Sequence, residues 1–216
     1  MGFRPIDPCA IAYTRSMDLQ PTPSKQPLLA GFTLDDIQAL VDDNPYLRGY
    51  LQGYLAESVL TSQLRSMPGV ESVTKIPDVS ERWGDLLLVY KGAEITIESK
   101  SLCSGILRQD VLNEAWEASV LCKNTDKRTV YVEGLGEVQS VNLHKGGFDI
   151  LSICTYPVTG EWRFLFLENR MLPEPDDKPG FIKSRFVINT ATTVGLTEDA
   201  AKVLEAVLEQ KRGFLC

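Results

Sequence analysis

The chain has 216 residues, a net charge of −7, and contents of 44 % hydrophobic and 24 % charged residues, which are ordinary values for a globular domain. This length suffices for one domain with a sizeable core and small extensions. No apolar run approaches the roughly 18 residues that a membrane helix needs. The N-terminal residues also lack the apolar segment of a signal peptide. We therefore expect a cytoplasmic protein that does not act at a membrane.

Charge and residue counts argue against several kinds of site. The negative charge disfavours nucleic-acid binding by an overall positive field, although a local basic groove beside carboxylates stays compatible with it. The five cysteines include no Cys-x-x-Cys pair, which disfavours a disulfide framework or a zinc site, and their spacing does not suggest an iron–sulfur cluster. The single histidine, His144, gives little support to a histidine-based metal site or a Ser-His-Asp triad.

The chain begins with an irregular arm and two helices. Residues 1–30 are rich in proline and lack sustained periodicity, so we expect an arm there and a single domain over residues 31–216. Thr33 has the position of an N-cap for a first helix. Asn44-Pro45 marks the start of a second helix that extends to about Arg65.

A hairpin and a third helix are predicted next. Residues 86–90 are continuously apolar, as expected of a strand buried on both faces. Lys91-Gly92 is a two-residue hairpin loop, and residues 93–100 form the return strand. Apolar residues then recur at helical spacing over residues 105–122, which predicts a helix.

The last third contains a strand, a second hairpin and a helix. Residues 128–133 predict the strand, and residues 148–156 and 161–167 predict the hairpin. Thr197 has the position of the N-cap of a final helix that ends just before Gly213. This order of elements predicts an α/β or α+β fold.

Residues 82–102 carry most of the chemical information. Asp85 begins the first strand of the hairpin, and Glu98 and Lys100 lie two apart on the second, so their side chains share a face. The short loop brings Asp85 and Glu98 to the same end of the sheet. Carboxylates hold Mg²⁺, which polarises a phosphate and lowers the pKa of a bound water. A nearby lysine positions that water and balances developing negative charge.

Glu57 is a third acidic candidate. It lies on or beside the apolar stripe of the second helix, where a carboxylate needs a partner or a metal. Purely structural alternatives stay open: Asp85 as a turn cap, Glu98 and Lys100 on a solvated strand face, and Glu57 at a helix edge that reaches water.

This combination resembles the PD-(D/E)xK nuclease superfamily, which includes many restriction endonucleases. The match is at Asp85, Glu98 and Lys100, with Glu57 in the place of the acidic residue on the preceding helix. The resemblance implies an α/β, restriction-endonuclease-like mixed sheet flanked by helices, an αβββαβ core, with an extra C-terminal hairpin and helix. It also implies a deoxyribonuclease that uses Mg²⁺, with Mn²⁺ as a substitute. Asp85, Glu98 and Glu57 would then hold the metal, and Lys100 would join them in catalysis.

The sequence departs from the family pattern before the first aspartate. Gly84, not proline, precedes Asp85, whereas a literal Pro-Asp occurs at Pro77-Asp78 in the preceding loop. We prefer Asp85 because a strand position fixes the geometry of a side chain and a loop position does not. Asp78 is the alternative first acidic ligand.

Double-stranded DNA is the partner that the resemblance implies, and cleavage of both strands suggests a homodimer. Polar residues that could contact phosphates follow the site in sequence; they are Arg108, Gln109 on the predicted third helix, Lys123, Lys127 and Arg128, with Arg163 and Lys183 as further options. The first hypothesis is a restriction or defence endonuclease. The alternatives are a nuclease of the same fold for repair or single strands, and a catalytically silent DNA-binding or scaffold protein with a nuclease fold.

Overall fold

The computed structural model describes residues 29–78, 80, 82–103, 108–110, 115–132 and 136–213. The chain forms two compact units, Met1–Pro45 and Tyr46–Cys216. The expected arm over residues 1–30 lies almost wholly outside the described residues, so that boundary stays a prediction. Within the described ranges, no helix is both long enough and apolar enough to span a membrane.

The described part of the first unit contains helix α1 (Leu34–Asp43), which begins where the sequence predicts. Thr33 Oγ1 accepts a hydrogen bond from the backbone N–H of Asp36 at 3.1 Å, and the Asp36 carboxylate accepts one from Thr33 N at 2.9 Å. This reciprocal capping box satisfies backbone donors that the first helical turn leaves free.

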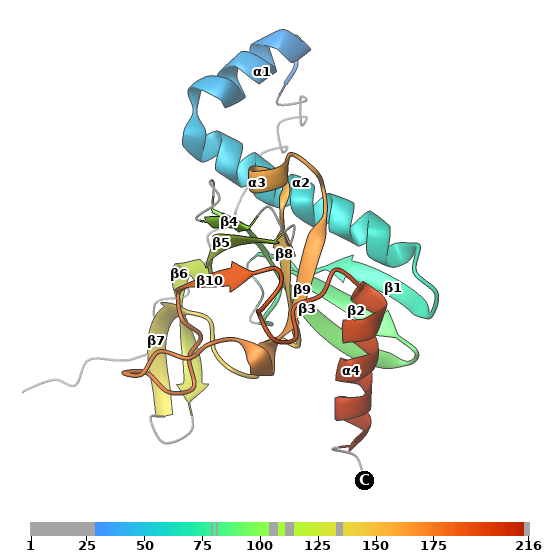
Figure 1. The fold of residues 1–216 in the computed structure, drawn as a ribbon. Coiled ribbons are helices and arrows are strands. Elements are labelled where there is room, and N and C mark those ends of the chain that lie inside the picture. The colour runs from blue at the N-terminus through green and yellow to red at the C-terminus, as the bar shows by residue number, and fades with distance from the viewer. Residues whose placement is uncertain are drawn as a thin grey trace, which may run out of the picture. The chain divides into compact units, whose positions relative to one another are not determined.

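A five-stranded sheet forms the centre of the second unit (Figure 1), with the order β1-β2-β3-β8-β9. Its strands are β1 (Val70–Lys75), β2 (Leu86–Tyr90), β3 (Ala93–Ser101), β8 (Ile150–Cys154) and β9 (Phe164–Glu168). Neighbouring strands are antiparallel except β3 and β8, which are parallel. Both predicted hairpins are present. Lys91 and Gly92 turn the first hairpin with φ values of 47° and 80°, as a two-residue hairpin loop requires.

Two helices, α2 (Pro45–Arg65) and α4 (Ala200–Gly213), pack on one face of this sheet. The second helix confirms the sequence prediction at both ends. The start of α4 corrects the predicted Thr197 cap, because Asp199 Oδ1 accepts the backbone N–H groups of Ala201 and Lys202 at 3.0 and 3.2 Å. Gly213 is the last residue of the helix, not the first beyond it.

The other face of the central sheet packs against a three-stranded sheet of order β10-β5-β4. Its strands are β4 (Arg108–Asp110), β5 (Ala115–Leu121) and β10 (Arg185–Asn189). This sheet contradicts the helix predicted over residues 105–122. Ala118, Val120 and Cys122 are buried at every second position, and β10 supplies the hydrogen-bonding partner of β5. A short apolar segment is compatible with the period of a helix and with that of a strand. The hydrogen bonds between β5 and β10 stabilise the strand.

A separate two-stranded sheet contains β6 (Lys123–Val132) and β7 (Gly136–Asn142). Strand β6 confirms the strand predicted from residue 128 and begins five residues earlier. Short helices α3 (Tyr156–Thr159) and η1 (Asn169–Met171) complete the described elements. The fold is therefore mixed α/β with a central mixed sheet. Between β3 and β8, however, the described residues form strands β4 to β7 where the αβββαβ arrangement would have a helix.

Candidate active site

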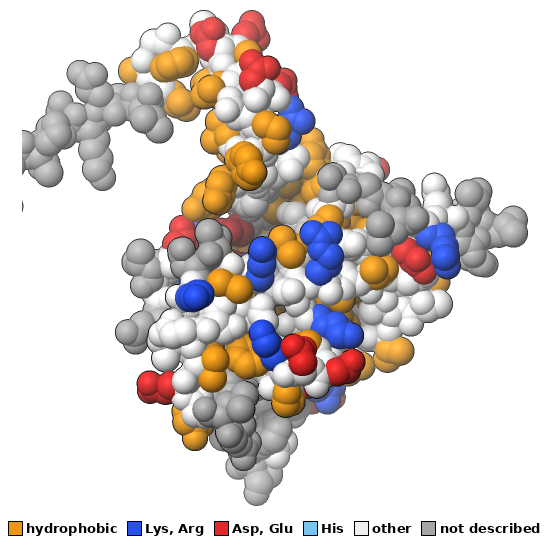
Figure 2. Space-filling view, turned by 90° about the vertical axis from the view of Figure 1, so that its left-hand side faces the viewer, with side chains coloured by type: hydrophobic (Ala, Val, Ile, Leu, Met, Phe, Trp, Pro, Cys, Tyr) orange, Lys and Arg blue, Asp and Glu red, His pale blue; other side chains and the backbone are white. Residues whose placement is uncertain are grey.

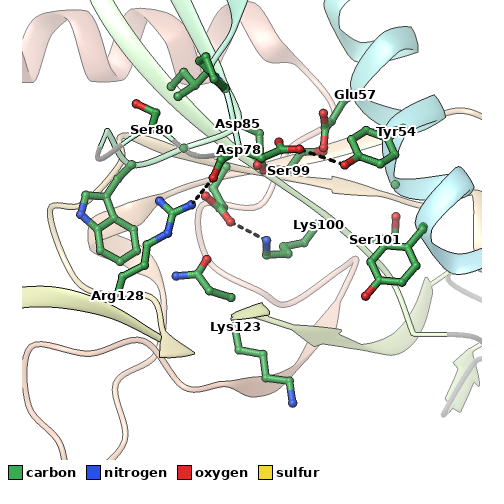
Figure 3. A pocket seen from close by; sticks show the side chains of 18 of the residues that line it. Tyr54, Glu57, Asp78, Ser80, Asp85, Ser99, Lys100, Ser101, Lys123 and Arg128 are labelled. Atoms are coloured by element: carbon green, nitrogen blue, oxygen red, sulfur yellow. Dashed lines mark hydrogen bonds and ion pairs between the residues drawn. The ribbon is translucent and has the colours of Figure 1, made fainter. Parts of the chain in front are cut away.

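A cavity of about 1160 Å³ lies on the second unit. Its walls come from α2, the loop between β1 and β2, strand β3 and strand β6. Seven residues that the sequence singles out line it: Glu57, Asp78, Asp85, Glu98, Lys100, Lys123 and Arg128. Figure 3 shows Asp85, Lys100 and Arg128 gathered around this space.

Asp85 occupies a fixed position at the entrance to β2. Its N–H donates to the Ile97 carbonyl at 2.8 Å, which continues the β2–β3 pairing and brings Asp85 beside Glu98. One carboxylate oxygen, Oδ2, accepts the N–H of Ser99 at 2.7 Å. This bond between a side chain and a strand backbone orients the carboxylate.

Gly84 explains the departure from a proline-aspartate motif. Its φ is 96°, and a Cβ at this position would lie 3.2 Å from the carbonyl oxygen of Ile97. Proline fixes φ near −65° and cannot adopt this conformation. A glycine before Asp85 is therefore what the local backbone requires.

Glu98 and Lys100 form an ion pair in which the glutamate is buried and the lysine is partly buried. Ile95 and Ile97 face the core below α2 and α4, so the alternate residues Glu98 and Lys100 face the opposite side. Glu98 is 4 % exposed, and Lys100 Nζ donates to its Oε1 at 2.5 Å. The solvated strand face that the sequence left open is therefore excluded.

The charges around this pair favour a protonated lysine. Burial raises the pKa of Glu98; Lys100 lowers it and Asp85 raises it further. Burial opposes the charge on Lys100, but Glu98 and Asp85 together raise its pKa above the ordinary value. Lys100 is therefore a cation at neutral pH, held between two acidic side chains.

Glu57 projects from α2 and pairs with a second lysine. Lys75 Nζ lies 2.7 Å from Glu57 Oε2, and Lys75 pairs with Leu86 at the end of β1 that lies next to Asp85. Burial raises the pKa of Glu57, the hydrogen bond from Lys75 lowers it, and the charge of Asp85 raises it. Asp85 thus acts on both glutamates, each of which already has a lysine partner.

Asp85 and Glu98 are the two carboxylates that could hold a hard divalent cation at this cavity. Mg²⁺ is typically held by one or two carboxylates and several waters, and these two side chains lie opposite one another on the cavity wall. Within the part of the chain that the structure describes, no three His, Cys, Asp or Glu side chains are grouped to hold a metal ion. Two carboxylates with water would fit such an ion, with Glu98 Oε1 bonded to Lys100. A set that includes Glu57 would also require Glu57 to leave Lys75.

Strand β6 supplies basic side chains opposite the carboxylates. Arg128 Nη2 donates to the Asp78 carbonyl at 3.4 Å, and its guanidinium carbon lies 5.2 Å from the centre of the Trp83 ring. Its charge also lowers the pKa of Glu98. Lys123, at the start of the same strand, is exposed at the cavity wall.

Three predicted DNA contacts do not line the cavity: Arg108, Gln109 and Lys127. Arg108 and Gln109 lie on β4 and not on a helix, because the segment predicted as the third helix forms strands where it is described. Arg163 also lies outside the lining and pairs with Glu198 at 2.5 Å.

The cavity also includes the alternative ligand Asp78 and several residues that sequence reasoning missed. Asp78, the alternative ligand, is an exposed loop residue whose Oδ2 accepts the Tyr54 hydroxyl at 3.0 Å. Tyr50 and Tyr54 line the cavity from α2; their spacing of seven and three residues from Glu57 was the available signal. Asn124 gave no signal, yet its Nδ2 atom is buried and has no hydrogen-bond acceptor among the described residues.

No protein-family model matches this chain, and no curated protein matches it. Among solved structures, the bacterial homing endonuclease I-Ssp6803I is similar at a TM-score of 0.35 and 17 % sequence identity. The similarity covers 62 % of this chain and 84 % of that chain. Values this low do not assign the chain to a fold family. The interpretation of the site therefore depends on the geometry of its own residues.

Proposed function

We propose that this protein is a metal-dependent nuclease that hydrolyses phosphodiester bonds in DNA, with Asp85, Glu98 and Lys100 as its active site. The observation that carries the proposal is the ion pair at 2.5 Å between the partly buried Lys100 and the buried Glu98, beside Asp85 on a cavity wall. An ion pair shielded from water adds little net stability, because removing the two charges from water costs free energy. A second carboxylate beside the pair adds like-charge repulsion. Chemistry on a phosphate gives this arrangement a use.

Each residue has a role that follows from its position. Asp85 and Glu98 would hold Mg²⁺, or Mn²⁺ as a substitute, and the bound ion would polarise the phosphate and lower the pKa of water. The Lys100 ammonium can donate a hydrogen bond to the attacking water or to a phosphate oxygen, and its charge offsets negative charge in the transition state. Arg128, which lines the same cavity, would bind a phosphate oxygen.

Glu57 comes from helix α2 and pairs with Lys75, not with Lys100. We assign it a positioning role, in which Glu57 and Lys75 set the electrostatic potential at Asp85. The biological part of the proposal, a cytoplasmic homodimer that cuts double-stranded DNA in restriction or defence, follows from the class resemblance alone.

The decisive experiment is cleavage of supercoiled and linear duplex DNA in Mg²⁺ or Mn²⁺. We expect Glu98→Gln and Lys100→Met to reduce the cleavage rate at least about 100-fold. Glu209→Gln, at an exposed position of α4, is the matched control and should cleave normally. Circular dichroism should show that all variants are folded.

Two outcomes would contradict the proposal. Cleavage that survives both site substitutions would place the active site elsewhere. A folded wild type that binds metal and cuts no DNA, whether duplex or single-stranded, would favour the alternative of a silent nuclease fold that binds DNA.

A further inference from the structure

One wall of the cavity is a helical surface made of two tyrosines and two glycines. Gly49, Tyr50, Gly53 and Tyr54 all line the cavity from α2. Tyr50 is 61 % exposed and Tyr54 is 50 % exposed. Large aromatic side chains gain free energy when they are buried, so two exposed rings at one hollow indicate a surface that a ligand can cover.

The glycines have no packing role among the residues that the structure describes. A Cβ added at Gly49 or Gly53 would meet nothing within 4 Å, and neither residue has a positive φ. A glycine inside a helix costs about 1 kcal/mol relative to alanine. The two glycines therefore lower the stability of α2, although no described neighbour would clash with a larger side chain. Without side chains at these positions, a ligand can approach the helix backbone closely.

The tyrosine nearer the carboxylates is held in place. The Tyr54 hydroxyl donates to Asp78, and Lys75 Nζ lies 4.2 Å from the centre of its ring. Figure 3 shows Tyr54 beside Glu57, on the side of the cavity away from Arg128 and Lys123. The aromatic wall and the basic wall therefore face the same space.

The two walls suit the two parts of a nucleotide. Aromatic rings stack on bases, and cationic side chains track the phosphates of a single strand. Although the net charge is −7, the face shown in Figure 2 carries several Lys and Arg side chains, with Asp and Glu side chains among them. The cavity of about 1160 Å³ also exceeds the roughly 300–1,000 Å³ that is usual for small-molecule sites, as a segment of polymer requires.

We infer that the surface formed by Gly49, Tyr50, Gly53 and Tyr54 binds unpaired nucleotides of a DNA strand. Tyr50 and Tyr54 stack the bases, while Lys123, Asn124 and Arg128 hold the backbone beside the reacting phosphate. In an intact duplex each base is already stacked on both sides and offers no free face. This inference rests on the proposed nuclease function and narrows its substrate to DNA with an unpaired stretch, such as a single strand or a flap.

Binding without metal tests the inference separately from cleavage. The probe is a short fluorescein-labelled single strand in EDTA, measured by anisotropy, with the duplex of the same sequence for comparison. We expect tighter binding of the single strand, and a weakening of about ten-fold in Tyr50→Ala. Tyr50→Phe, which keeps the ring, should bind like the wild type.

The same helix offers a matched control. Tyr46 is 88 % exposed on α2 and does not line the cavity, so Tyr46→Ala should bind like the wild type. An oligonucleotide with 2-aminopurine should also lose fluorescence when the base stacks on the wild type, and should not do so on Tyr50→Ala.

The outcomes separate the inference from the proposed function. Suppose that the protein cuts duplex DNA. If Tyr50→Ala then binds the single strand as tightly as Tyr46→Ala does, or if the wild type shows no preference for single strands, the inference is overturned and the proposed nuclease function stands. Ring-dependent binding in a protein that cuts no DNA would overturn the nuclease and support a single-strand-binding surface.

Discussion

At the scale of single residues, backbone conformation favours Asp85 over Asp78 as the aspartate of the proposed site. Asp85 follows a glycine with positive φ and is fixed by two bonds to β3. Asp78 lies in an exposed loop and bonds Tyr54. The literal Pro-Asp in the sequence therefore marks the weaker candidate, since only Asp85 has an orientation set by a strand.

His144 leads to a prediction on pH dependence. Its Nδ1 lies 2.9 Å from the Lys145 carbonyl oxygen, while Nε2 is buried with no partner among the described residues. Burial lowers the pKa of the imidazole, and the Lys145 carbonyl offsets this only in part. The unfolded chain, with an ordinary pKa of about 6.5, therefore binds the proton more tightly than the folded protein. The neutral ring contributes stability above about pH 6.5, and this is lost as the pH falls through the folded pKa.

Proton NMR can measure this directly because the chain has a single histidine. The ring resonance should titrate with a pKa below about 6.5 in the folded protein. The free energy of unfolding should also fall between pH 7 and pH 5. A folded pKa at or above the ordinary value would contradict the buried environment described for Nε2.

At the scale of elements, the start of α4 gives a prediction on stability. Asp199 accepts two backbone N–H groups of the first turn, whereas Thr197 Oγ1 accepts only the N–H of Asp199. Asp199→Ala should lower the free energy of unfolding by about 1 kcal/mol, and Asp199→Asn should cost less because asparagine also caps helices. Urea denaturation measures both. If Thr197→Ala lowers the free energy of unfolding more than Asp199→Ala does, Thr197 and not Asp199 is the N-cap.

The elements also show where sequence patterns suffice. Caps and tight turns depend on residues within a few positions of one another, so α1, α2 and the Lys91-Gly92 hairpin could be predicted. Strand β5 could not, because its register depends on β10, about 70 residues later. Arg108 and Gln109 were consequently assigned to the wrong kind of element.

At the scale of the whole molecule, metal binding should stabilise the fold. An ion that binds only the folded state adds about 2.7 kcal/mol at 100 times its Kd, and a chain of this size gains about 2–4 °C per kcal/mol. Mg²⁺ or Mn²⁺ should therefore raise the melting temperature of the wild type by several degrees. Differential scanning fluorimetry across a metal titration measures the shift.

The control for this prediction is the double variant Asp85→Asn/Glu98→Gln. It should show no metal-dependent shift. Without metal it should be less stable than the wild type, because both acidic neighbours of the Lys100 ammonium are neutralised. An equal shift in both proteins would assign the metal to another part of the chain.

The sequence by itself determined the features that depend on spacing. These are the two helix starts at Thr33 and Asn44, the hairpin, and the shared face of Glu98 and Lys100, which follows from the two-residue period of a strand. Only the tertiary structure decided the partners of these residues. Lys75 on β1 pairs with Glu57 on α2, and β6 brings Arg128 and Asn124 to the cavity that the carboxylates line. Such contacts between distant segments depend on how sheets and helices pack, so they leave no periodic signal in the sequence.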